Sequence, residues 1–265
     1  MRILSAFLLV SAAAISAQPS IFAEDDAQPP ATELTSLQGS FSEISALPGG
    51  SFGVMAVDLA SGQTVGSGEG RVYDIGNPDL FAIPCALERV ESGAQSLDYQ
   101  VSPDRTFEDI LIVAGTGDDE YTSKVVSIIG RETISSWLES KGLSQSEMGG
   151  VFMDWEGAPV PLPNRSSLED CSEIVQTLNE LLSNSLTRRV MADPFAGSPE
   201  LEAYEGSFSA VYGISSIDAA GSSRCLIFIY PDGGRVGLLL LGDDLSSSGR
   251  ADAAMEIALS ALAEL

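Results

Sequence analysis

The chain of 265 residues contains no histidine. Without an imidazole it cannot form Ser-His-Asp or Cys-His nucleophilic sites, and it cannot bind zinc through histidine. Lysine is almost as scarce, since Lys124 and Lys141 are the only two. Neither has a serine three residues before it, and neither is followed by Thr-Gly or Ser-Gly. The catalytic motifs S-x-x-K and K-T-G are therefore absent.

Cysteine is also rare, and Cys85, Cys171 and Cys225 lie far apart without a C-x-x-C motif. We interpret them as small apolar residues of the core. The alternative, in an oxidising compartment, is that two of them pair and one thiol is left over. Spacing alone does not decide between these alternatives. The Gly-x-Gly stretch at 66–70 does not lead directly into a helix, so we interpret it as a loop and expect no cofactor.

Positive charge is in short supply as well. The chain has 13 basic and 38 acidic residues, a formal net charge of −25. Such a surface repels nucleic acid and anionic lipid head groups, which excludes nucleic acid as a partner. An acidic surface keeps the protein soluble, including at high salt, or it serves to attract a cationic partner. The length suits one domain with a sizeable core or two sub-domains that share an interface.

The first 23 residues have the pattern of an export signal. Arg2 gives the positive end, and an apolar run follows over 3–14. The sequence allows cleavage after Ala17, cleavage after Ala23, or retention as a membrane anchor. No cysteine lies near these positions, so a lipoprotein anchor is not expected. Residues 24–32 are predicted to be a flexible linker. The expected location is therefore the periplasm, the cell surface or the medium.

The stretch from 71 to 101 organises the rest of the chain. Leu80, Pro84 and Leu87 recur at helical spacing, which predicts a core helix. Asn77 or Asp79 is expected to cap its start, and Pro84 should lie near the N-terminal end, where a missing N–H costs least. Gly93 is a stop signal.

Apolar periodicity and turn residues predict the other elements. Helices are expected over 33–47, 106–114, 118–129, 132–141, 168–182 and 245–265, with a further turn at 187–191. Strands are expected over 51–58, 63–67, 207–214, 224–230 and 235–241, with a hairpin turn at 231–234. Residues 143–165 are rich in glycine and proline and should form loops.

This order of elements resembles the serine hydrolase family of class A β-lactamases and penicillin-binding proteins. The segment GDDEYTSKVVSIIGRETISSWLESKGL is similar to the family's S-D-N segment and its following helices, and the three last strands followed by a helix are similar to its closing pattern. The resemblance implies an α/β (α+β) fold. An antiparallel sheet from the N- and C-terminal segments, about 33–70 and 204–265, would be flanked by helices, with a helical sub-domain at about 71–203 inserted between them.

The residues at the family's catalytic positions differ. Aligning the family's proline with Pro84 puts Asp79 at the nucleophilic serine and Ala82 at the lysine. The S-D-N positions are then Gly117, Asp118 and Asp119. The K-T-G position falls within 213–217, where no register supplies a lysine. Glu156 lies in the loop where class A enzymes carry a deacylating glutamate, but it lacks the E-x-x-L-N context and receives no role.

Two hypotheses follow from these replacements. The first is an exported protein without catalytic or metal-binding residues, which binds an envelope protein or wall component, for example as an accessory subunit of a membrane or wall-associated complex. Phe81 and Ala82 would then fill the old cleft. The alternative is a hydrolase with a rebuilt site, in which Asp79, Asp118 and Asp119 share a cleft for acid–base or metal-assisted chemistry. The simpler interpretation of these acids is capping of helix starts.

Overall fold

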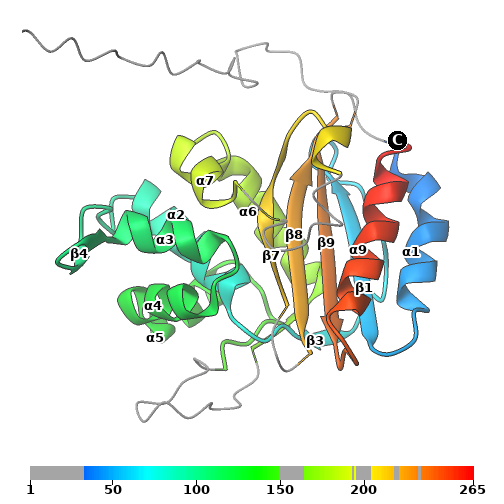
Figure 1. The fold of residues 1–265 in the computed structure, drawn as a ribbon. Coiled ribbons are helices and arrows are strands. Elements are labelled where there is room, and N and C mark those ends of the chain that lie inside the picture. Colours follow the sequence, from blue (N-terminus) through cyan, green and yellow to red (C-terminus); the bar gives the residue numbers. More distant parts are fainter. Residues whose placement is uncertain (1–32, 150–163, 193, 195–203, 218–220, 232–233) are drawn as a thin grey trace, which may run out of the picture.

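A five-stranded antiparallel sheet forms the centre of the protein, with strand order β2-β1-β9-β8-β7 (Figure 1). The computed structural model describes residues 33–149, 164–192, 194, 204–217, 221–231 and 234–265. The strands are β1 (Ser51–Asp58), β2 (Thr64–Ser67), β7 (Val211–Ile217), β8 (Ser223–Ile229) and β9 (Val236–Asp243). Helices cover both faces of the sheet, which confirms the predicted fold class.

The N- and C-terminal segments meet in this sheet. β1 pairs with β9 along its whole length, from Ser51 opposite Asp243 to Asp58 opposite Val236. The buried carboxylate of Asp58 closes the β1–β2 turn, since it accepts hydrogen bonds from the Ala60 N–H at 2.9 Å and the Ser61 hydroxyl at 2.7 Å. The hairpin is therefore fixed at its turn by a side chain and along its length by the last strand of the chain.

Alternating apolar side chains give the sheet two buried faces. One face packs against a short 3-10 helix (Leu34–Leu37), α1 (Gln38–Ser45) and α9 (Gly249–Leu262), which lie side by side in Figure 1. The other face packs against the remaining helices. In β9, Leu238 and Leu240 face the first layer, and Leu239 and Leu241 face the second.

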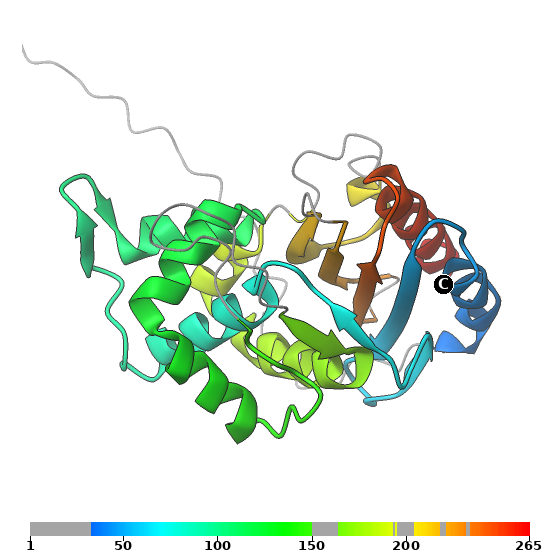
Figure 2. The same cartoon turned by 90° about the horizontal axis from the view of Figure 1, so that it is seen from below.

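The second layer is built around α2 (Asp79–Glu91), which contacts α3, α4, α5 and α6 (Figure 2). The other helices of this layer are α3 (Phe107–Gly115), α4 (Asp119–Ile129), α5 (Arg131–Ser140), α6 (Leu168–Leu181) and α7 (Ser185–Val190). Two small ribbons accompany them, β3 (Val72–Asp74) with β6 (Arg165–Ser167), and β4 (Gln100–Ser102) with β5 (Arg105–Thr106). The first of these ribbons leads the chain into α2.

The organising helix is confirmed, and it is buried more completely than its periodicity predicts. Every residue over 79–87 is buried, not one face alone. Gly93 follows the helix with φ of 73°, the left-handed conformation that ends a helix. Pro84 lies in the second turn, one turn later than the position where its missing N–H costs least. Contacts on all sides hold the helix in spite of this proline.

Other predicted elements shift by a few residues. β7 begins at Val211 instead of 207, because Glu205–Ser207 forms a 3-10 turn before it. α9 begins at Gly249 instead of 245, and the turn expected at 187–191 is part of α7. Cys85, Cys171 and Cys225 are buried and unpaired, as the core interpretation predicted. Burial raises the pKa of each thiol to about 12.

Several predictions fall outside the described residues. They are the export signal, the linker, Glu156 and the tip of the hairpin turn at 232–233. Within the parts of the chain that the structure describes, none of the helices combines the length and apolar character needed to cross a bilayer.

Candidate functional site

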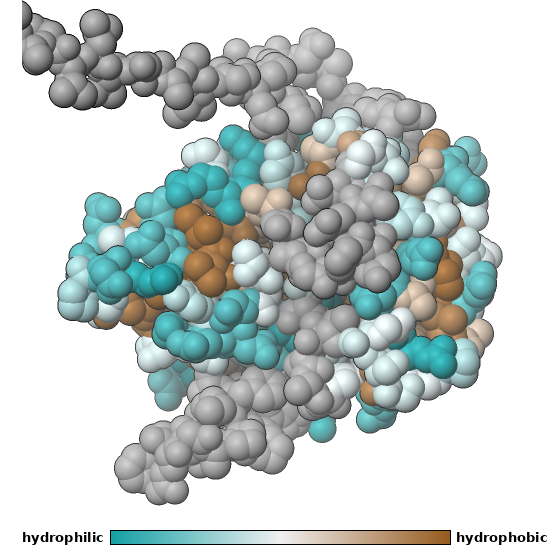
Figure 3. Space-filling view, viewed as in Figure 1, coloured by the Kyte–Doolittle hydropathy of each residue, from teal (hydrophilic) through white to brown (hydrophobic). Residues whose placement is uncertain are grey.

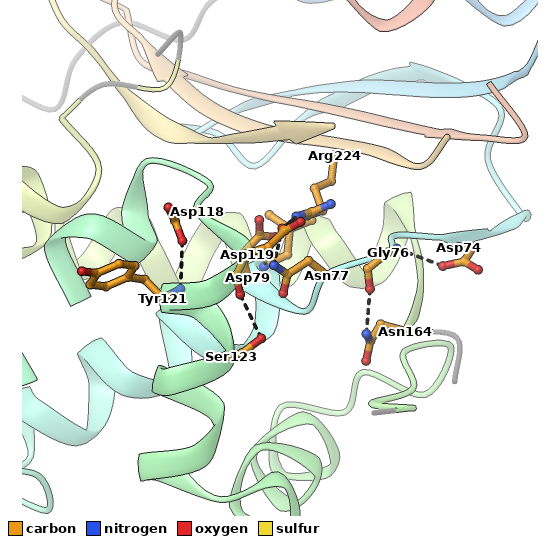
Figure 4. Close-up of polar contacts among 11 residues, drawn as sticks. Asp74, Gly76, Asn77, Asp79, Asp118, Asp119, Tyr121, Ser123, Asn164 and Arg224 are labelled. Atoms are coloured by element: carbon orange, nitrogen blue, oxygen red, sulfur yellow. Dashed lines mark hydrogen bonds and ion pairs between the residues drawn. The ribbon is translucent and has the colours of Figure 1, made fainter. Parts of the chain in front are cut away.

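Asp79 is the first residue of α2, and its side chain is fully buried. Its Oδ1 accepts hydrogen bonds from the Leu80 N–H at 2.7 Å and from Nε of Arg224 at 2.6 Å (Figure 4). The expectation that Asn77 or Asp79 caps the helix is wrong, because Pro78 takes the N-cap position without a side-chain bond. The Asp79 carboxylate is instead one half of a buried ion pair.

Arg224 supplies the other half from the second residue of β8, and its side chain is also fully buried. Side chains alternate along the strand, so Arg224 shares the face of Leu226 and Phe228, which pack against the helical layer. The guanidinium therefore projects from the sheet toward the start of α2. The sequence comparison predicts no cation here, because it places the K-T-G position in β7 at 213–217, where the sequence holds none.

Asp119 forms the outer part of the same cluster. Its Oδ1 accepts a hydrogen bond from the amide of the buried Asn77 and lies 3.5 Å from Nη2 of Arg224. The Asp119 side chain is 56% exposed, whereas those of Asp79 and Arg224 are 0% exposed. The cluster thus runs from a buried ion pair to a carboxylate at the surface.

The remaining predicted site residues do not join this cluster. Asp118 is the N-cap of α4, where its Oδ1 accepts the Tyr121 N–H at 2.9 Å, and Figure 4 shows it turned toward that residue. Gly117 has φ of 82° in the turn between α3 and α4. Ala82 and Phe81 are buried in the core. Of the five predicted positions, only Asp79 and Asp119 come together, and Arg224 joins them.

The loop before α2 is held by its own hydrogen bonds. Oδ1 of Asp74 accepts the Gly76 N–H at 2.9 Å, and the Asn164 amide donates to the Gly76 carbonyl at 2.6 Å. The Ile75 N–H donates to the Asn164 carbonyl at 2.9 Å. These bonds fix the chain just before Asn77, so the polar cluster is positioned by backbone that is itself constrained.

Burial dominates the electrostatics of this cluster. It raises the pKa of the Asp79 carboxyl, and the charge and hydrogen bond of Arg224 oppose that rise. Oδ2 of Asp79 and Oδ1 of Asn77 are buried without a hydrogen-bond partner among the described residues. The described residues also contain no group of three or more acidic or cysteine ligands placed to hold a metal ion. A guanidinium occupies the centre, where a metal would have to bind.

Comparisons with known proteins place this geometry in a known fold. No protein-family model matches the chain, and no curated protein matches it. Solved structures do match: a reconstructed ancestral class A β-lactamase of Gram-negative bacteria has a TM-score of 0.69 at 16% identity, covering 86% of this chain and 99% of that one. A β-lactamase from Xanthomonas campestris pv. campestris has a TM-score of 0.67 at 15% identity, covering 86% and 97%. The chain therefore has the fold of the class A β-lactamases.

The buried ion pair predicts strong coupling between Asp79 and Arg224. Asp79→Ala or Arg224→Met leaves one charge buried without its partner and should lower the free energy of unfolding by about 3–5 kcal/mol. The double variant removes both charges and should cost much less than the sum of the two single changes. Urea denaturation measures all three. The exposed pair of Glu120 and Lys124 is the control, since Glu120→Ala should lower the free energy of unfolding far less than either change at the buried pair. Additive losses at Asp79 and Arg224 would refute the coupling.

The raised pKa of Asp79 predicts a pH dependence once its cation is removed. In Arg224→Met the opposing charge is lost, so the folded protein binds a proton at Asp79 more tightly than the unfolded chain, where the carboxyl pKa is about 3.9. The free energy of unfolding is then highest below about pH 4 and falls as pH rises through the folded-state pKa. Urea denaturation across this range measures the slope. The Asp79→Asn/Arg224→Met variant lacks the carboxyl and is the reference; parallel curves would contradict the prediction.

Proposed function

We propose that this chain is an exported, non-catalytic protein of the β-lactamase fold, which acts by binding a partner in the cell envelope. The observation that carries the proposal is the burial of Asp79 at the position that the family pattern gives to the nucleophile. Its side chain is 0% exposed and lies 2.6 Å from the Arg224 guanidinium. A substrate would have to displace a buried ion pair to reach it.

The chemistry of the site supports the same conclusion. Acyl transfer by this fold needs a hydroxyl nucleophile with a base beside it. Ala82 and Gly117 carry neither a base nor a hydroxyl, and the carboxylate of Asp79 is fully buried and bound to Arg224, out of reach of a substrate. What the fold retains is a rigid scaffold, and a scaffold without its site can still serve in recognition.

The export signal pattern at 1–23 and the charge of the chain point to the kind of partner. A protein of formal net charge −25 attracts a partner with a basic surface and is repelled by anionic ones. An accessory subunit of a membrane or wall-associated complex fits this description. The attraction between such surfaces is long-range and weakens as salt screens it.

A second candidate is a hydrolase with a rebuilt, carboxylate-based site that is metal-assisted. It is favoured by the exposed carboxylate of Asp119 beside the buried Asp79, whose Oδ2 has no hydrogen-bond partner among the described residues. The Arg224 guanidinium weakens this candidate, because it already neutralises the two carboxylates that a metal would need. We therefore place it second.

Intact mass tests the non-catalytic assignment. The purified mature protein is incubated with benzylpenicillin and with a fluorophosphonate, beside Asp79→Ala and the off-site variant Asp118→Ala. No covalent adduct and no penicillin hydrolysis are expected for any of the three, because Asp79, at the position that the resemblance gives to the nucleophile, is fully buried. An adduct on the wild-type protein that disappears in Asp79→Ala but persists in Asp118→Ala would overturn the assignment and support the second candidate.

Retention on envelope fractions tests the binding part of the proposal. The mature protein should sediment with envelopes at low salt, and retention should fall as salt shortens the Debye length from about 10 Å at 0.1 M to about 3 Å at 1 M. Envelopes treated with protease and envelopes treated with muramidase separate a protein partner from a wall partner. Equal sedimentation with and without envelopes would contradict the proposal.

A further inference from the structure

A concave site lies toward the other end of α2. A groove of about 470 Å³ runs between α2 and α5, and this volume falls within the range of small-molecule sites. Its lining residues are Cys85, Arg89, Glu132, Thr133, Ser136, Trp137 and Ser140. Arg89 follows Asp79 by ten residues in the same helix, about 15 Å along its axis. The groove is therefore separate from the ion-pair cluster.

The floor of the groove is apolar and held in place. Trp137 is 9% exposed and Cys85 is 1% exposed. The indole Nε1 of Trp137 donates a hydrogen bond to Glu88, whose other oxygen accepts from Nζ of Lys141 at 2.8 Å. Burial raises the pKa of Glu88, but these hydrogen bonds outweigh it and lower the pKa overall, so this carboxylate stays ionised at neutral pH and is committed to its partners. The aromatic floor is thus formed before any ligand arrives.

Hydroxyl groups line the α5 side of the groove. Thr133, Ser136 and Ser140 recur at i, i+3 and i+7, so they share one face of α5 with Trp137. The Ser140 hydroxyl donates to the Trp137 carbonyl at 2.8 Å, which leaves its lone pairs as acceptors. The hydroxyls of Thr133 and Ser136 make no hydrogen bond to other described residues. Three polar groups therefore stand above an aromatic floor.

Arg89 provides the charge. It forms no ion pair within the described part of the chain, and its one hydrogen bond is a long contact of 3.4 Å from Nη2 to the Ala94 carbonyl. Its Nε is buried without a partner among the described residues. The Nη1 and Nη2 groups thus have donors left to take an oxyanion, whereas Nε is buried. Glu132 is the opposing charge at the groove, and Glu88 is already bound to Lys141 and Trp137.

We propose that this groove binds a small hydroxylated carboxylate of the sugar-acid class. Arg89 would take the carboxylate, since a guanidinium fork matches its two oxygens. Trp137 would contact the apolar face of the ring, while the three hydroxyls and Glu132 exchange hydrogen bonds with its hydroxyl groups. Glu132 disfavours a doubly charged phosphate and can accept hydrogen bonds from a sugar. This inference does not depend on the proposed function, because it concerns another site.

Calorimetric titration of the mature protein tests the groove with glucuronate as the probe. Glucose lacks the carboxylate, acetate lacks the hydroxyls, and inorganic phosphate is a plain oxyanion. Glucuronate should bind saturably and at least about tenfold more tightly than each of the three. Arg89→Gln should weaken glucuronate binding by about tenfold or more. Arg131→Gln, an exposed arginine of α5 outside the groove lining, should leave it unchanged.

Ser136→Leu is a second test of the groove that stays informative if Arg89→Gln does not fold. Ser136 is exposed, so a leucine there fills the groove without touching the core, and it should also abolish binding. The sugar-acid assignment is overturned if phosphate or acetate binds as tightly as glucuronate. The site itself is overturned if glucuronate does not bind, or if it binds equally to the wild-type protein, Arg89→Gln and Ser136→Leu. None of these outcomes alters the covalent-adduct experiment, so the two proposals fail separately.

Discussion

The buried ion pair between Asp79 and Arg224 joins the two layers of this protein across 145 residues of sequence. Asp79 begins α2 and Arg224 projects from β8, so the pair ties α2 to the sheet. Moving both charges out of water is costly, and their attraction offsets that cost only with good geometry. The 2.6 Å contact and the backbone bond from Leu80 provide such geometry.

This constraint makes the position that the resemblance gives to the nucleophile part of the packing of the fold. A nucleophile has to be exposed on one side, whereas α2 is buried throughout 79–87, and its first side chain points at a cation in the core. The loop before α2 is fixed through Asp74 and Asn164, and the Asn77 amide donates to Asp119. Oδ1 of Asn77 and Oδ2 of Asp79 have no partner among the described residues, but both atoms are buried.

Much of the fold could be predicted from the sequence because its signals are local. The alternation in Ser51–Asp58 gives β1, the left-handed Gly93 ends α2, and Asp118 before an apolar pattern marks the start of α4. The ion pair could not be predicted this way. An aspartate at the start of a helix has the same local sequence pattern whether it caps the helix or is buried. In Asp79 the outcome depends on Arg224, which is far away in the sequence and which no local pattern connects to Asp79. The available signal is a single arginine at the edge of an apolar run, and that pattern predicts only the start of a strand.

Several of the few basic side chains are bound within the protein and are not available to a ligand. Arg71, Lys124, Lys141, Arg189 and Arg224 are each bound to a carboxylate. An ion pair within the protein makes a basic side chain unavailable to a ligand. Arg89, like the exposed Arg131, forms no ion pair with a described residue, but Arg89 also lines a groove with a fixed aromatic floor. The two ends of α2 therefore differ. At its start, Arg224 is neutralised by carboxylates of the protein itself. Near its end, the guanidinium of Arg89 can bind an anion from outside, as we propose.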